Sequence, residues 1–120
     1  MQIQMSTDGN IEGREELATR TNLVVESGLN RFSDHITRVE IHLSDENSDK
    51  KGGNDDIRCV MEARLEGRQP VAVTHQAATV DQAVDGAVDK LHRLIESTLG
   101  RLRDHRESQH RSASLGATND

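Results

Sequence analysis

Apolar and polar residues alternate in four short segments of the chain, which is the period of a β-strand with one buried face. The first segment is residues 1–5, where Ile3 and Met5 share a phase. Two longer segments, 36–44 and 57–66, and a shorter one, 71–76, carry the same alternation. The pattern therefore predicts four strands, each with one face turned towards a core.

Two other segments have the period of an α-helix. Between about residues 13 and 32 the positions on one face are Leu17, Thr21, Val24, Val25, Gly28 and Phe32. A second stripe runs from Val80 to Leu102, directly after Thr79, a residue type favoured as an N-cap. Gly28 lowers helix propensity by about 1 kcal/mol relative to Ala. We interpret it as a point of close approach between the first helix and the sheet.

The remaining segments predict turns and a tail. Residues 45–56 are charged, contain two adjacent glycines and no apolar residue until the strand resumes, which favours a mobile hairpin loop. Residues 67–70 predict a tight turn. Residues 106–120 have no periodicity and are rich in small polar residues, which is typical of a disordered tail. We therefore expect one domain over 1–105 followed by a tail over 106–120.

The element order is β-α-β-β-β-α, which predicts an α+β fold. A right-handed βαβ crossover makes the first two strands parallel, and short connections make the last three antiparallel. The result is a four-stranded mixed sheet with both helices on one face, in an order that resembles double-stranded RNA-binding domains. The opposite face would carry a mixture of charges, from Arg38, Glu40, His42, Arg58, Glu62 and Arg64.

Charge and composition restrict how such a domain could contact RNA. The chain of 120 residues has 15 Lys and Arg against 21 Asp and Glu, a net charge of −6, which argues against non-specific polyanion binding. Phe32 is the only aromatic residue, so stacking of bases on rings is excluded. Residues 90–106 nevertheless hold five basic residues against two acidic ones. Any RNA contact must therefore rest on shape and on phosphates near this segment.

Enzyme and metal chemistry are not expected. The six histidines form no HxxxH or HExxH pair, and no nucleophile, base and oxyanion site assemble in the sequence. Cys59 is the single cysteine and belongs to the apolar phase of its strand, which predicts a buried, inert thiol and no disulfide. Asp85 and Asp89 lie one helical turn apart, as on a solvated face where carboxylates pair with nearby Arg or Lys. We expect a non-enzyme without cofactor or metal.

The strand over 71–76 passes directly into the second helix, which carries A-V-D-x-x-x-D-K-L over residues 83–91. This stretch resembles the ribosome hibernation-promoting factor family, also called ribosome-associated inhibitor A or sigma-54 modulation proteins. The resemblance continues through residues 10–17, Arg31 and Phe32, and residues 36–43, and it covers about residues 1–105.

The resemblance implies a bacterial stress factor that binds the small ribosomal subunit near the decoding channel, blocks translation and preserves inactive ribosomes. It implies contacts to ribosomal RNA phosphates from Lys90, Arg93, Arg101 and Arg103, with Arg20, Arg31 and Arg38 as weaker candidates. We expect a short form without a dimerisation domain, located in the cytoplasm. No membrane or DNA contact is expected, and self-association would at most give a weak homodimer.

An alternative stays open, because cations near the end of a helix are also favoured by the helix dipole. Four positions that are basic in the family are Val24, Ser27, Ser97 and Leu99 in this chain. The alternative is a diverged acidic member that acts through protein–protein contacts, or through self-association at a sheet edge, without binding ribosomes.

Overall fold

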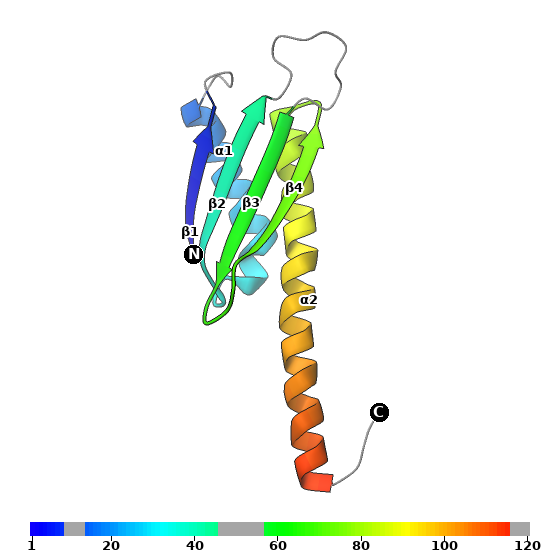
Figure 1. The fold of residues 1–120 in the computed structure, drawn as a ribbon. Helices are drawn as coiled ribbons and strands as arrows, with labels where there is room; N and C mark the ends of the chain where they lie inside the picture. Colours follow the sequence, from blue (N-terminus) through cyan, green and yellow to red (C-terminus); the bar gives the residue numbers. More distant parts are fainter. Residues whose placement is uncertain (9–13, 46–56, 116–120) are drawn as a thin grey trace.

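The computed structural model describes the backbone of residues 1–8, 14–45 and 57–115, and side chains as far as residue 100. Most of the expected hairpin loop, residues 46–56, lies outside the described residues. The elements are β1 (Gln2–Thr7), α1 (Arg14–Leu29), the 3-10 turn η1 (Asn30–Phe32), β2 (Ile36–Asp45), β3 (Ile57–Leu65), β4 (Val71–Ala77) and α2 (Val80–Leu115) (Figure 1). The predicted element order is confirmed.

The four strands form one sheet in the order β1-β2-β3-β4. Strand β1 runs parallel to β2, with Ile3 opposite Val39, while β3 is antiparallel to both of its neighbours. The predicted mixed sheet is therefore confirmed, and its two edges are β1 and β4.

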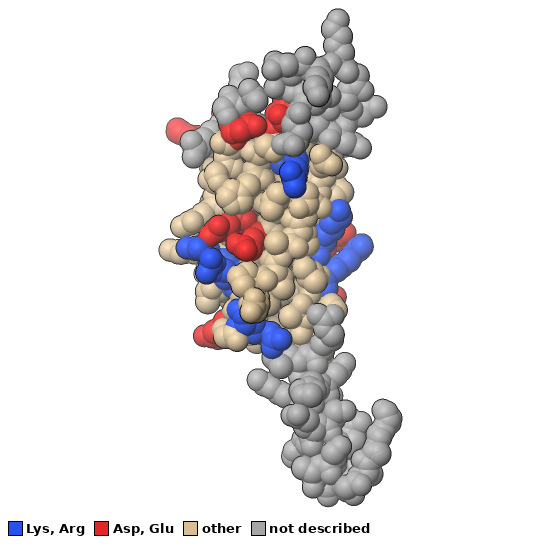
Figure 2. Space-filling model, viewed as in Figure 1, with Lys and Arg blue, Asp and Glu red and all other residues tan. Residues whose placement is uncertain are grey.

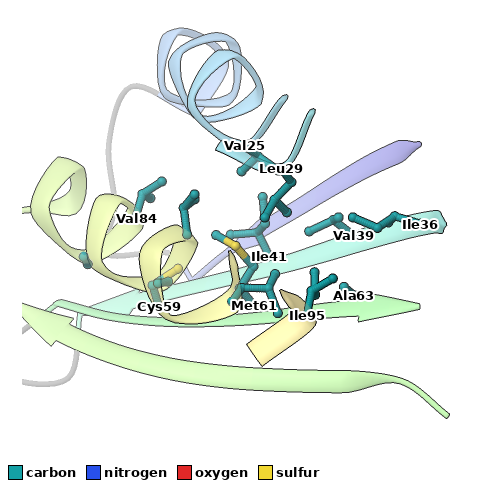
Figure 3. Packing of buried hydrophobic residues seen from close by; sticks show 14 of the residues in the cluster. Val25, Leu29, Ile36, Val39, Ile41, Cys59, Met61, Ala63, Val84 and Ile95 are labelled. Atoms are coloured by element: carbon teal, nitrogen blue, oxygen red, sulfur yellow. The ribbon is translucent and has the colours of Figure 1, made fainter. Parts of the chain in front are cut away.

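Both helices cover the same face of the sheet, and the core lies between them and the strands (Figure 1). Figure 3 shows Val25 and Leu29 of α1 and Ile95 of α2 pointing towards Ile41 and Met61 on the sheet. Burial of each large aliphatic side chain contributes roughly 1.5–3 kcal/mol, and the core holds many of them in place of aromatic rings. The helices are thus fixed on the sheet by aliphatic packing.

Helix α2 begins as expected and ends later than expected. Thr79 is its N-cap, because its Oγ1 accepts a hydrogen bond of 3.2 Å from the backbone N–H of Gln82. The helix continues to Leu115, so residues 106–115 of the expected tail have helical backbone, and residues 116–120 lie outside the described residues. No Pro or Gly interrupts residues 101–115, and each added helical residue adds one hydrogen bond. The helix therefore extends well past the sheet (Figure 1).

Two glycines mark close contacts of α2 with its neighbours. A Cβ at Gly28 would lie 2.3 Å from Cγ1 of Val88, so Gly28 makes its close approach to α2. The expectation that it approaches the sheet is wrong. The physical reason is that α1 and α2 cross at this point on the same face of the sheet. Similarly, a Cβ at Gly86 would lie 2.1 Å from the ring of His75 on β4. The bare glycine backbones let both contacts form.

Candidate nucleic-acid interface

The two candidates in the middle of α2 are held by partners within the chain. The Lys90 Nζ donates a hydrogen bond of 3.0 Å to the carbonyl oxygen of Thr74 on the edge strand β4. The Arg93 guanidinium lies 3.0 Å from a carboxylate oxygen of Asp89, one turn earlier, and both side chains are exposed. The expectation that an acid of this helix face pairs with a nearby cation is met by Asp89.

Two further candidates tie the first half of the chain to α2. Arg20 of α1 forms an ion pair of 3.2 Å with Asp81, in the first turn of α2. Arg31 of η1 forms an ion pair of 3.1 Å with Glu96, and its guanidinium lies 5.6 Å from the centre of the Phe32 ring. These two arginines therefore bridge elements at opposite ends of the interface between α1 and α2.

The remaining candidates lie elsewhere. Arg38 is on the open face of the sheet, half-buried and paired with Glu40, and its buried Nε has no hydrogen-bond partner in the described part of the chain. The side chains of Arg101 and Arg103 lie outside the described residues. The five described candidates are thus spread over two helices, a turn and the opposite sheet face, and the structure does not gather them into one positive surface.

The ion pairs of Arg20, Arg31 and Arg93 are weak restraints. Each joins side chains that are more than half exposed, and pairs of this kind contribute about 0–1 kcal/mol because water screens them. A phosphate could replace the carboxylate at small cost. The carboxylate would however remain beside the incoming phosphate, so each pair offers RNA almost no net positive charge.

The open face of the sheet carries the predicted mixture of charges. Arg38 lies opposite Arg64, and Glu40 lies opposite Glu62, in adjacent rows across β2 and β3. Figure 2 shows this side of the molecule, with basic and acidic side chains interspersed. No field of a single sign forms on the described part of this face, so it is a poor surface for phosphates.

Arg64 and Arg68 are two further basic residues, which the sequence pattern did not single out as RNA-binding candidates. Within the described residues neither side chain forms an ion pair. Arg68 follows Gly67, whose φ of 69° makes the tight β3–β4 turn, and it lines a groove of about 720 Å³ together with Arg31. Glu66 and Glu96 line the same groove and balance its charge. For Arg68, the sequence signal was a basic residue between Gly67 and Pro70 in a predicted tight turn.

A second groove lies between α1 and α2 and has a different character. Its volume is about 660 Å³, and its walls include Leu23 and Val24 of α1 and Val88 of α2. The polar groups on its walls are Ser27, His92 and the carboxylates of Asp85 and Asp89, and none of its lining residues is Lys or Arg. This groove is therefore apolar and acidic.

Cys59 has the buried environment that its strand phase predicts. Its side chain is fully buried in the core, and burial raises the pKa of the thiol from its ordinary value of 9.0 to about 12. A thiol with this pKa is protonated at neutral pH.

The described residues contain no group of three or more metal-ligating side chains. No described helix is long and apolar enough to cross a bilayer.

Comparisons with solved structures find the same fold. The N-terminal domain of Protein Y from Thermus thermophilus is 22% identical, with a TM-score of 0.57 over 82% of this chain and 99% of that one. A ribosomal subunit interface protein from Coxiella burnetii is 16% identical, with a TM-score of 0.61 over 83% of this chain and 99% of that one. No curated protein has a significant sequence match.

The sequence also matches a family model, and the match covers most of the domain. The model describes the sigma 54 modulation protein and S30EA ribosomal protein family, and it aligns with residues 9–103 of the 120 residues. The aligned region begins before α1 and ends within α2, and therefore includes α1, the first two thirds of α2 and three of the four strands. The chain belongs to the sigma 54 modulation protein and S30EA ribosomal protein family, whose members are ribosome-associated.

Proposed function

We propose that this protein binds the small ribosomal subunit near the decoding channel and promotes ribosome hibernation under stress. The observation that carries the proposal is the family match over residues 9–103. The protein acts in the cytoplasm by steric occlusion and performs no chemistry. The long helix α2, which extends past the sheet, supports a steric role because it lengthens the domain (Figure 1).

The outer face of α2 is the proposed contact with ribosomal RNA. At about 100° per residue, positions 90, 93 and 101 fall within about 80° of arc on this helix, while position 103 lies about 140° from position 90. Lys90, Arg93 and Arg101 therefore approach phosphates from one direction. Arg103, Arg20 and Arg31 contact the RNA only at the margins of this face, and Arg38 on the far side of the sheet is the weakest candidate.

Few unpaired cations on this surface imply weak and salt-sensitive binding. Each phosphate contact changes the logarithm of affinity by about 0.7–0.9 for each tenfold change in salt. Three contacts from α2 therefore predict about a tenfold or larger loss between about 50 and about 200 mM salt. The net charge of −6 adds a repulsion that also increases as salt is removed.

Co-sedimentation with purified small ribosomal subunits tests the proposal. The full chain should pellet with subunits at about 50 mM salt and should be released by the double variant Arg93→Glu and Arg101→Glu. Arg58→Glu, on the exposed side of β3, is the control and should still bind. The proposal is wrong if the wild-type chain stays in the supernatant at low salt, or if the control and the double variant are released equally.

A second candidate function is action through protein contacts without ribosome binding. The apolar and acidic groove between α1 and α2 favours it, because such a lining suits a protein surface better than a phosphate backbone. A chain of this second kind would not pellet with subunits at any salt concentration and would form a protein complex that is unaffected by the Arg93→Glu and Arg101→Glu changes.

A further inference from the structure

The groove between α1 and α2 exposes an aliphatic side chain that the fold itself does not need. Leu23 is 63% exposed, and Met1 is the only other large hydrophobic residue exposed in the described part of the chain. Beside Leu23 the walls continue with the half-buried Val24 and with Val88. Leu23 therefore offers a partner an exposed aliphatic contact at the rim of this shallow groove.

Asp85 and Asp89 line the α2 side of the groove, and Asp81 precedes them on the same helix. Asp81, Asp85 and Asp89 follow one another at four-residue intervals, so they project from one side of the helix. Asp81 is paired with Arg20 and Asp89 with Arg93, whereas Asp85 forms no ion pair within the described residues. Asp85 therefore places an uncompensated negative charge directly beside the apolar walls.

This combination discriminates against RNA. Phosphates need cations to replace their counterions, and the lining residues include two carboxylates and no Lys or Arg. Bases need a free aromatic or guanidinium plane for stacking, and the one ring in the lining, His92, already packs on Phe32. The charge and the apolar walls fit instead a helix with an apolar stripe flanked by Lys or Arg, which is a common mode of recognition in a groove.

We propose that the groove between α1 and α2 binds a basic amphipathic helix of a partner protein. Apolar side chains of that helix pack on Leu23, Val24 and Val88, and a flanking Lys or Arg pairs with Asp85. The two existing helices form the walls, so the bound segment lies as a third helix along them. The bound helix contacts none of the candidate RNA-binding residues directly, although Asp89 in the lining is paired with Arg93.

Calorimetric titration of the full chain with synthetic helices tests the proposal. The probe is a peptide of about five turns, built from Leu at core spacing and Lys elsewhere. One matched peptide replaces each Lys by Glu, and another has the same Leu and Lys content in scrambled order. We expect the Leu–Lys helix to bind at least tenfold more tightly than either matched peptide.

Substitutions in the lining test whether the peptide binds in the groove between α1 and α2. Asp85→Lys and Leu23→Ser should each weaken binding of the Leu–Lys helix about tenfold or more, which corresponds to about 1.4 kcal/mol. Asp34→Lys, an equal charge change at an exposed position before β2, is the control and should have little effect. If Asp85→Lys does not fold, Leu23→Ser and the matched peptides still decide the outcome. Amide chemical shifts of Ser27 and Val88 should move on binding.

Several outcomes overturn the proposal. Equal binding of the scrambled peptide, or equal weakening by Asp34→Lys, means that the interaction is only a general attraction of charges. Shifts at Ser27 and Val88 on addition of an A-form RNA duplex, without shifts from the peptide, assign the groove to RNA. Concentration-dependent dimerisation that Asp85→Lys abolishes in the absence of peptide assigns the groove to a second copy of this chain.

Discussion

Gly28 of α1 and Val88 of α2 lie in contact where the two helices cross, and a Cβ at position 28 would be 2.3 Å from Cγ1 of Val88. One turn along α2, Nδ1 of His92 lies 3.0 Å from the carbonyl oxygen of Gly28, within hydrogen-bond distance. The His92 ring also packs on Phe32, with ring centres 4.9 Å apart. The crossing of the helices is therefore fixed by a contact that only glycine allows and by the imidazole beside it.

Replacement of Gly28 by Ala should destabilise the protein. Helix propensity alone would favour Ala by about 1 kcal/mol, but the new methyl group meets a stiff β-branched side chain, and overpacking of this kind costs about 1–3 kcal/mol. We expect a lower urea midpoint. Gly100→Ala is the control, because nothing lies within 4 Å of its Cβ position, and it should raise stability by about 1 kcal/mol.

A double-mutant cycle tests the cause of that loss. Val88→Ala removes the methyl group that a Cβ at position 28 would meet, so Gly28→Ala should cost much less in the Val88→Ala background. Urea unfolding of the four proteins measures the coupling free energy. Independent effects of the two substitutions, or a stabilising effect of Gly28→Ala alone, would show that the crossing has room for a methyl group.

The buried thiol of Cys59 should make stability fall at high pH. The folded chain has a pKa of about 12 for this thiol, whereas the unfolded chain has the ordinary value of 9.0, so the unfolded state loses its proton first. The contribution is fully present below about pH 9 and decreases by up to about 1.4 kcal/mol per pH unit above it. Urea unfolding at a series of pH values should give a shallower decrease for Cys59→Ala, and identical slopes would contradict the assignment.

Removal of two carboxylates should strengthen ribosome binding. Asp89→Asn and Glu96→Gln release Arg93 and Arg31 from exposed ion pairs, so each substitution should change the folding free energy by no more than about 1 kcal/mol. The two guanidinium groups then meet phosphates without a carboxylate beside them, so sedimentation with small subunits should show a higher affinity.

A charge-matched control separates this effect from net charge. Glu26→Gln with Asp34→Asn also removes two exposed carboxylates, neither of which forms an ion pair within the described residues. An equal gain in affinity from this control would mean that the general repulsion between the acidic chain and RNA matters more than the paired arginines.

Loss of the N-cap of α2 should destabilise the domain. Thr79→Ala removes the hydroxyl that accepts a hydrogen bond from the N–H of Gln82, and substitutions of this kind cost about 0.5–2 kcal/mol. Thr79→Ser keeps the hydroxyl and should be close to wild type. Thermal unfolding followed by circular dichroism measures both variants. Equal melting temperatures for the Ala and Ser variants would show that this hydrogen bond does not stabilise the start of the helix.

The sequence by itself determined the elements, the buried face of each strand and the start of α2. These features are local, because alternation or a four-residue period is set by which face meets the core, and a cap is set within one turn. Cys59 and Thr79 were predicted correctly for this reason. The lysine and arginines of the candidate site stay a prediction, which rests on the resemblance to the family.

Only the tertiary structure decided what Arg20 and Arg31 touch. Arg20 and Asp81 are 61 residues apart, and Arg31 and Glu96 are 65 residues apart, so their pairing depends on how α1 and α2 cross. A hydrophobic stripe fixes which side of a helix is buried but leaves its crossing angle and its position along the neighbour open, because these depend on the fit between side-chain ridges and grooves. That fit placed Gly28 against Val88, paired Arg20 and Arg31 with carboxylates of α2 and left an apolar, acidic groove between the helices.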